Sequence, residues 1–255
     1  MKNSERIEII IREVQEKGQV KVGELSKILG CSEVTVRNDI RKLDDQGILK
    51  KTHGGAEKRS QGLCVQFEPG EYYLNADYKR RIAERAYEYI DDKDTIMIDD
   101  SSTCCYLAQY IRERGEKRIS VVTNSVYVAA ELSGAENINV HILGGQVSSK
   151  PSSVMGNITA EAVRQYHVNK LFSGINAIDF QIGLTSADSM HAEVKRAMIE
   201  RADETYILAD HTKMGRGGLF SVCSMDQVKC IITDNDISKD MFNQAEKRKI
   251  TLNLV

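Results

Sequence analysis

Residues 20–43, VKVGELSKILGCSEVTVRNDIRKL, contain two short helical patterns separated by Gly30. The first has apolar residues at the spacing of one helix face: Val22, Leu25, Ile28 and Leu29. The second, which Ser32 can cap, has an apolar stripe of its own: Val36, Ile40 and Leu43. Two helices joined by so tight a turn are typical of units that place the second helix in a DNA groove.

A preceding helix and a following hairpin complete this first unit. The preceding helix has its own apolar stripe: Ile7, Ile10, Ile11 and Val14. Gly18 ends that helix, and Gly47 ends the helix that Ser32 caps. A short mixed run, 48–52, is followed by the turn residues 53–55. Residues 1–57 are therefore predicted to form three helices and a hairpin-like wing, a winged helix-turn-helix domain.

The exposed face of the predicted recognition helix and the wing carry groups that suit DNA: Ser32, Val34, Thr35, Arg37, Asn38, Arg41, Lys51 and His53. An amide pairs with adenine, a guanidinium with guanine or phosphate, and a methyl group contacts thymine. A hydroxyl at a helix N-terminus can hold a phosphate. Any surface helix is polar opposite its core, so this pattern alone favours DNA binding without establishing it.

The stretches 20–26 and 31–40, with Leu43, Gly47 and 53–56, resemble the signature of DeoR-type winged helix-turn-helix regulators. The resemblance spans nearly the whole of residues 1–57, and it implies that double-stranded operator DNA is a partner. One position departs from the family pattern, because Asn38 stands where a second Arg is usual. We therefore expect an operator preference that differs at the base read by this residue.

The rest of the chain divides into a linker and a larger domain. Residues 58–77 lack a clear period and include Gly62, Pro69 and Gly70, so we expect a linker there. A helix is predicted over 78–90, and short apolar runs then alternate with helical stretches: 95–99, 119–123, 138–143, 170–175, 205–210 and 228–233. This alternation predicts that residues 78–255 form an α/β domain with a parallel-rich sheet covered on both faces.

Polar residues and glycines gather where the predicted strands end, which is where ligands bind in open α/β sheets. The run Asp99–Thr103 follows a strand and opens a helix, so its hydroxyls and free N–H groups suit a phosphate or a carboxylate. The predicted ligand-binding residues at these ends are Asp99, Ser101, Ser102, Thr103, Thr123, Asn124, Gly144, Gly145, Asp210 and Lys213. Helix capping, a tight glycine turn and a weak surface ion pair are the structural alternatives for these features.

Residues 78–234 resemble the effector domain of DeoR-type regulators, in the stretches 98–99, 102–103, 121–125, 143–145, 183–185, 193–195 and 209–210, with Gly156, Lys213 and Gly215. The resemblance implies a fold related to sugar-phosphate isomerases and a phosphorylated sugar as effector. It implies that Ser101–Thr103 take the phosphate, and that the rest of the pocket is lined by Thr123, Asn124, Asn176, Glu193, Asp210 and Lys213. Ser101 and Ala177 stand where the family usually has Gly, so the identity of the sugar does not carry over.

Composition narrows the function further. The 255 residues include 35 Lys and Arg against 37 Asp and Glu, a net charge of −2, which argues against a whole surface that grips a membrane or nucleic acid. The six Cys have no C-x-x-C spacing, and the five His form no metal-binding spacing, so we expect reduced thiols, no metal and no cofactor. No apolar run approaches the length of a membrane-spanning helix, and no secretory leader is evident, so a cytoplasmic location is expected.

Two other functions are compatible with parts of this sequence. The first is a sugar-phosphate isomerase with an added domain, in which Asp99, Asp100, Glu193 and Asp210 could shuttle a proton. The second is an adaptor that binds protein through its winged helix, although protein interfaces favour aromatic anchors. We expect instead a transcriptional regulator that is not an enzyme. Specifically, we expect a repressor of a carbohydrate-utilisation operon. It should work as a dimer or larger homo-oligomer, because one winged helix reads too few bases.

Overall fold

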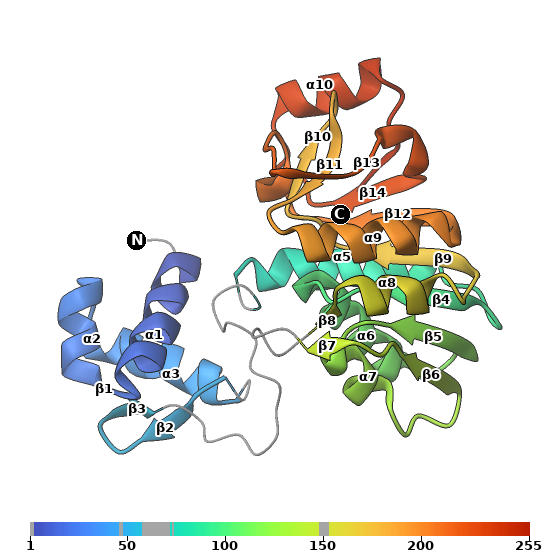
Figure 1. The fold of residues 1–255 in the computed structure, drawn as a ribbon. Helices are drawn as coiled ribbons and strands as arrows, with labels where there is room; N and C mark the ends of the chain where they lie inside the picture. Colours follow the sequence, from blue (N-terminus) through green and yellow to red (C-terminus); the bar gives the residue numbers. More distant parts are fainter. Residues whose placement is uncertain (1–2, 46–47, 58–71, 73, 148–152) are drawn as a thin grey trace. The chain divides into compact units, whose positions relative to one another are not determined.

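The computed structural model describes residues 3–45, 48–57, 72, 74–147 and 153–255. The chain divides into two compact units, Met1–Asn75 and Ala76–Val255 (Figure 1). Most of the expected linker, residues 58–71 and 73, lies outside the described residues. Among the described residues, no helix has the length and apolar character needed to cross a membrane.

The first unit consists of three helices and a small antiparallel sheet with the strand order β1-β3-β2. The helices are α1 (Asn3–Lys17), α2 (Val22–Leu29) and α3 (Glu33–Asp45). The strands are β1 (Gln19–Lys21), β2 (Lys50–Thr52) and β3 (Gly55–Glu57). The apolar stripes of the three helices meet in one core that includes the fully buried Ile10, Leu25 and Val36. This core leaves the opposite side of α3 exposed.

Strand β1 was not foreseen, because three residues are too short to show a period of two. It pairs with β3, and its central Val20 is buried. The contact explains Gly55, since a Cβ at that position would lie 1.9 Å from the carbonyl oxygen of Val20. The wing is thus a three-stranded sheet instead of a simple hairpin.

The second unit is built on a seven-stranded sheet with the order β15-β14-β12-β9-β4-β5-β6, in which all neighbours are parallel. Its strands are β4 (Thr95–Ile98), β5 (Ile119–Thr123), β6 (Ile138–Ile142), β9 (Val168–Ser173), β12 (Ala202–Leu208), β14 (Cys230–Thr233) and β15 (Leu252–Leu254). The sheet confirms the predicted α/β class with a parallel sheet. Parallel pairing also brings every strand's carboxyl end to the same edge.

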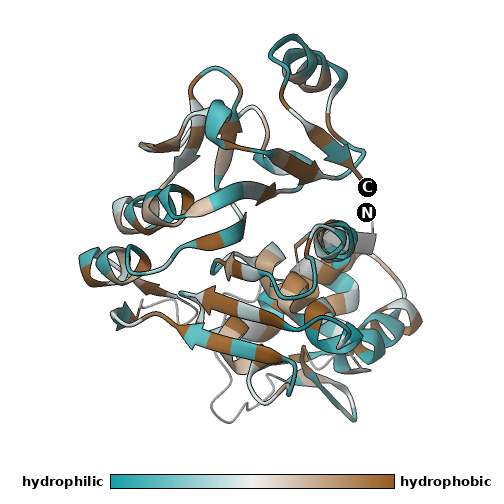
Figure 2. Cartoon of the chain, turned by 90° about the vertical axis from the view of Figure 1, so that its right-hand side faces the viewer, coloured by the Kyte–Doolittle hydropathy of each residue, from teal (hydrophilic) through white to brown (hydrophobic). Residues whose placement is uncertain are grey.

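Helices cover both faces of this sheet. They are α5 (Ala76–Glu88), α6 (Ser102–Arg114), α7 (Val126–Leu132), α8 (Asn157–Val163), α9 (Ser189–Glu200) and α10 (Lys239–Lys247). Met97, Leu171 and Ile207 face the side covered by α8, α9 and α10, while α5, α6 and α7 lie on the opposite side. Because both faces are covered, the strands are largely apolar where they are buried, and Figure 2 shows hydrophobic residues concentrated on them.

Several short strands add to the main sheet. An antiparallel sheet has the order β10-β11-β13, made of β10 (Ala177–Asp179), β11 (Gly183–Ser186) and β13 (Phe220–Cys223). A two-stranded ribbon joins β7 (Gln146–Val147) to β8 (Val154–Met155). The sequence did not predict these strands, because each has only two to four residues and lies between turn-forming segments.

Candidate functional site

The exposed face of α3 has the groups expected of a DNA-reading helix. Val34 is 64% exposed, and the Thr35 N–H donates to the Ser32 hydroxyl over 3.2 Å, which caps the helix. Seven of the eight predicted DNA-binding residues are exposed and Thr35 is half-buried; the exposed ones are Ser32, Val34, Arg37, Asn38, Arg41, Lys51 and His53. The last two lie on β2 and on the turn that follows it. All of them lie in the first unit.

Two ion pairs shape this helix. Arg37 reaches back one turn to Glu33 over 2.7 Å, and both side chains are exposed. The buried Asp39, on the inner side of α3, holds Arg6 of α1 over 2.5 Å. This second pair fixes α1 against α3, and no sequence pattern indicated it.

The carboxyl edge of the parallel sheet carries a buried ion pair between Asp99, after β4, and Lys195 of α9. The Asp99 carboxylate also accepts hydrogen bonds from the N–H groups of Ser101 and Gly174, each over 2.9 Å, and from the Ser173 hydroxyl over 2.5 Å. Lys195 donates to the Gly174 carbonyl over 2.9 Å. The pair therefore ties the β4–α6 loop, the end of β9 and α9 together.

Charge and burial oppose each other at this pair. Burial alone would raise the pKa of Asp99, but the Lys195 ammonium and the donated hydrogen bonds outweigh it and lower the pKa to about 2. Burial would lower the pKa of Lys195, and the neighbouring Asp99 charge reverses this and raises it. Both groups are charged at neutral pH. Asp99 is fully buried, and its carboxylate holds the start of the β4–α6 loop through the Ser101 N–H.

The loop above this pair opens α6. Ser101 caps the helix by accepting the Cys104 N–H over 3.3 Å, and Ser102 and Thr103 form its first turn. The first N–H groups of a helix have no partner within it, so they are available to an anion. Gly174 touches this loop, and a Cβ there would lie 2.4 Å from the Cβ of Ser101. Ser102 is half-buried and Thr103 is buried.

The next strand end carries Thr123 and Asn124, both buried. The Thr123 hydroxyl accepts the Ser125 N–H over 3.0 Å, and the Asn124 side-chain NH₂ donates to the Val154 carbonyl over 3.3 Å. The Asn124 amide oxygen is also buried, yet it has no hydrogen-bond partner among the described residues. A buried acceptor without a donor costs free energy, so this oxygen is suited to a hydroxyl or N–H brought by a ligand.

Gly145, the second residue of the glycine pair after β6, has a structural explanation. Gly145 has a φ of +147°, and a Cβ there would lie 2.1 Å from the hydroxyl oxygen of Thr159. That hydroxyl donates to the Gly144 carbonyl over 3.1 Å. Packing against α8 therefore accounts for Gly145 without a ligand.

The other predicted ligand-binding residues lie on neighbouring segments. Asn176 is exposed and accepts the Ser186 hydroxyl over 3.1 Å, while Glu193 is half-buried on α9. Asp210 is buried after β12, and its carboxylate accepts both the N–H and the hydroxyl of Thr212. The Asp210 charge is therefore engaged by Thr212, and Lys213 is half-buried in the 3₁₀ turn η1 (His211–Lys213).

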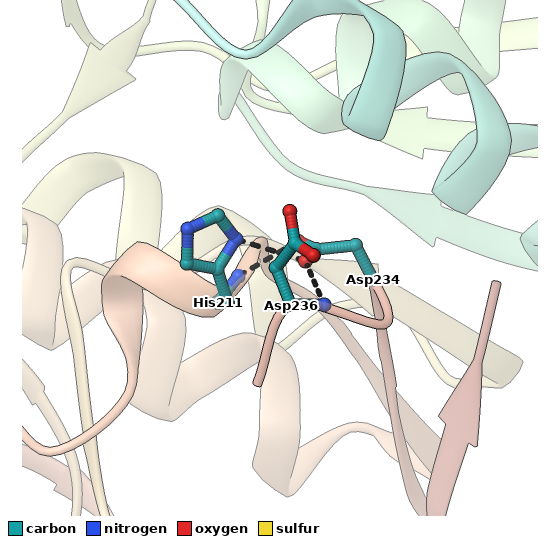
Figure 3. Close-up of side chains that lie close together, drawn as sticks. All are labelled: His211, Asp234 and Asp236. Carbon is teal, nitrogen blue, oxygen red and sulfur yellow. Dashed lines mark hydrogen bonds and ion pairs between the residues drawn. The ribbon is translucent and has the colours of Figure 1, made fainter. Parts of the chain in front are cut away.

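The edge also brings together residues that the sequence did not group. His211, Asp234 and Asp236 come from the loops after β12 and β14, and their candidate metal-ligand atoms lie within 4.8 Å of one another (Figure 3). The spacing of His and Cys residues along one element does not predict this cluster, because two separate loops supply its residues. An Asp directly after a strand, as at Asp99, was the available signal for Asp234. For Lys195, the signal was a Lys on the buried stripe of its helix.

Two family models match the chain. The model described as the DeoR C terminal sensor domain matches residues 74–235, and the model described as the DeoR-like helix-turn-helix domain matches residues 6–61.

Similar proteins match along nearly the whole chain. An uncharacterized HTH-type transcriptional regulator, YulB of Bacillus subtilis, is 32% identical over 99% of this chain and 96% of its own. A putative aga operon transcriptional repressor of Escherichia coli O157:H7 is 30% identical over 99% and 94%. An L-fucose operon activator of Haemophilus influenzae is 27% identical over 96% and 97%. Among solved structures, ribose 5-phosphate isomerase A of Methanocaldococcus jannaschii is similar in fold, with 18% identity, a TM-score of 0.40 and 55% of each chain covered.

Proposed function

Since the chain belongs to the DeoR family of helix-turn-helix transcriptional regulators, we propose that it is a cytoplasmic repressor of a carbohydrate-utilisation operon, released by a phosphorylated sugar. The first unit would bind the operator through α3 and the wing. The unit Ala76–Val255 would bind the effector at the carboxyl edge of its sheet. The relatives that match along the whole chain are named as transcriptional regulators, so the isomerase alternative is set aside.

The loop at the start of α6 carries the effector proposal. Ser102 and Thr103 present hydroxyl and N–H groups at the N-terminus of a 13-residue helix, where the helix dipole favours an anion. The buried ion pair of Asp99 and Lys195 fixes this loop from beneath. The unpartnered amide oxygen of Asn124, directly after the neighbouring strand β5, is an acceptor to which a sugar hydroxyl could donate. Together these groups suit a ligand that has both a phosphate and hydroxyls.

Control of DNA binding would follow from linkage. The effector shifts the regulator between two arrangements only by its different affinity for each of them. We propose that at least two copies bind together, because a single winged helix reads too few bases for a useful specificity ratio. The effector-bound arrangement would hold the recognition helices at the wrong spacing for the operator half-sites. Relatives are named both as repressors and as an activator, and the titration below measures the direction of control.

The direct test is a fluorescence-anisotropy titration of the full-length protein against DNA upstream of its own operon. It is repeated with a panel of hexose and pentose phosphates at fixed salt, because phosphate contacts make affinity salt-dependent. Tight binding that one phosphosugar weakens is the expected result. Binding that the sugar tightens would contradict release, and absence of specific DNA binding would contradict the regulator role.

Arg37→Ala should weaken operator binding by about 1–3 kcal/mol, roughly 5- to 150-fold in affinity, since it removes a guanidinium from the exposed face of α3. Calorimetry should show unchanged phosphosugar binding, because that site lies in the other unit. Arg164→Ala is a matched control, since Arg164 also pairs with a Glu on one helix surface, over 2.5 Å, but in the second unit. Equal operator affinity of the Arg37 and Arg164 variants would remove Arg37 from the interface.

The double variant Ser102→Ala/Thr103→Ala should bind the operator normally but fail to release it when the phosphosugar is added. Two hydroxyls that would hold the phosphate are gone, so we expect phosphosugar affinity to fall about tenfold or more. Anisotropy measures release, and calorimetry measures sugar affinity. Ser133→Ala, at the exposed C-terminal end of α7, is the control for loss of a serine hydroxyl. A double variant that still responds normally would refute the phosphate assignment.

A further inference from the structure

His211 is held in a fixed orientation by a buried carboxylate. Asp234 is fully buried, and its two oxygens accept the Nδ1–H and the backbone N–H of His211, each over 2.8 Å. A carboxylate can only accept hydrogen bonds, so Nδ1 carries the hydrogen. In the neutral ring, the other nitrogen, Nε2, is then a free acceptor. Figure 3 shows this second nitrogen on the side of the ring away from both carboxylates.

The group is built as a hydrogen-bonded network and not as a set of open metal ligands. Asp234 also accepts the N–H of Asp236 over 2.9 Å, so a metal would have to displace several of its donors. The Tyr78 hydroxyl donates to Asp236, and its ring meets the His211 ring edge-on, with centroids 5.3 Å apart. The imidazole is therefore held on two sides while its side chain stays 29% exposed. Such a fixed and accessible polar group is preorganised for binding.

The position of His211 relates it to the phosphate loop. It lies just after β12, and β9 alone separates β12 from β4 in the sheet. A Cβ added to Gly174, which follows β9, would lie 2.4 Å from the Cβ of Ser101. It would lie 3.7 Å from the carbonyl oxygen of Leu208, the last residue of β12. Neighbouring strands are about 4.8 Å apart, so the ends of β4 and β12 are separated by roughly 10 Å. The carbon chain of a phosphorylated sugar can bridge that separation.

We propose that His211 is an effector-recognition residue, whose Nε2 accepts a hydrogen bond from a sugar hydroxyl while the phosphate lies at the start of α6. Asp234 acts as the positioning residue that holds the hydrogen of the neutral ring on Nδ1 and fixes the ring's orientation. This inference rests on the proposed function, because it needs a phosphorylated sugar at this edge. It assigns recognition of the sugar to the loops after β12 and β14, and recognition of the phosphate to the β4–α6 loop.

His211→Asn is the sharpest variant, because an asparagine amide can still donate to Asp234 from near the Nδ1 position while it lacks Nε2. The full-length variant is titrated by calorimetry with the panel of hexose and pentose phosphates and with inorganic phosphate. Affinity for the sugar phosphate that binds the unmodified protein most tightly should fall about tenfold, the cost of one hydrogen bond of about 1.4 kcal/mol. Affinity for inorganic phosphate and for the operator should not change.

His167→Asn is the matched control. Its Nε2 lies 2.9 Å from Asp203, so it too is a His beside an Asp, but it precedes β9 at the opposite edge of the sheet. Sugar-phosphate affinity should be unchanged in this variant. A loss shared by both variants would show a general effect of removing an imidazole and would overturn the assignment.

Monodeoxy analogues of the tightest sugar phosphate then identify the hydroxyl concerned. One analogue should bind the unmodified protein about tenfold more weakly than the parent sugar phosphate does. The His211→Asn protein should bind that analogue and the parent with equal affinity, as a double-mutant cycle requires when the two groups interact. If the unmodified protein binds the sugar phosphate and the variant binds it equally well, only this inference is overturned. If the unmodified protein binds no member of the panel, the proposed function itself fails.

The ¹⁵N chemical shifts of His211 in the unmodified protein give a readout that does not depend on a folded variant. The Nδ1–H form should be seen before any ligand is added. The Nε2 signal should move when the sugar phosphate binds and stay in place when inorganic phosphate binds. A hydrogen on Nε2 in the free protein, or an Nε2 signal indifferent to the sugar, would contradict the proposal.

Discussion

Lys195→Met should lower the free energy of unfolding of the second unit by about 3–5 kcal/mol at pH 7, because it leaves the Asp99 carboxylate buried without its counter-charge. Lys195 is 6% exposed and Asp99 is fully buried, so water cannot replace the lost ammonium. Methionine fills a similar volume, so the loss reports charge more than packing. Urea unfolding followed by circular dichroism measures it.

The deficit should depend on pH with a definite sign. In the unmodified protein the pKa of Asp99 is lowered to about 2, below its ordinary 3.8, so the pair stabilises the fold above about pH 4 and that contribution disappears as pH falls towards 2. In the variant, burial without Lys195 should raise the pKa of Asp99 above its ordinary value. The stability lost in the variant is then smallest at pH values where Asp99 is protonated in both the folded and the unfolded protein. The difference between the two proteins should therefore shrink from pH 7 towards pH 3.

Two further variants separate this effect from others. Lys229→Met removes an exposed Lys that lies 3.1 Å from Glu204, and it should cost less than about 1 kcal/mol. Adding Asp99→Asn to Lys195→Met should recover part of the lost stability, because the unpaired charge is gone. Equal costs for the two Lys variants, or a deficit independent of pH, would show that the buried pair does not act as argued.

Gly174→Ala should abolish the response to phosphosugar while operator binding persists. The added Cβ would lie 2.4 Å from the Cβ of Ser101 and 2.5 Å from its hydroxyl oxygen, closer than such atoms approach. The loop that opens α6 must move, and the phosphate-binding groups of Ser102 and Thr103 move with it. Overpacking of this kind costs about 1–3 kcal/mol of stability, so the unit should remain folded.

Anisotropy of operator DNA with added phosphosugar measures the response, and calorimetry measures sugar affinity. Gly217→Ala is the matched control, because the nearest atom to its added Cβ is the Ile182 Cδ1, at an ordinary 3.9 Å. Adding Ser101→Gly to Gly174→Ala removes the clashing side chain and should restore the response. Loss of the Ser101 helix cap should lower the free energy of unfolding by only a few tenths of a kcal/mol. A normal response in Gly174→Ala alone would mean that the loop position does not matter for the effector.

Local patterns determined much of the architecture from the sequence. The stripe of Val36, Ile40 and Leu43 predicts both that α3 is a helix and which of its sides is exposed, because a helix repeats every 3.6 residues. The apolar runs predict the central parallel strands, since strands buried on both faces lack polar residues. The roles of the polar residues on the exposed side of α3 and at the strand ends stay predictions.

Only the tertiary structure decided the contacts within the candidate effector site. Lys195 and Asp99 are 96 residues apart, Gly174 and Asp99 are 75 apart, and His211 and Asp234 are 23 apart. No sequence period relates such residues; the parallel strand order does, because it gathers the ends of distant strands at one edge. The sequence by itself thus determined the helices, the central strands and the side of α3 that can meet DNA. Strand order decided which charges are buried together and which imidazole nitrogen is left free.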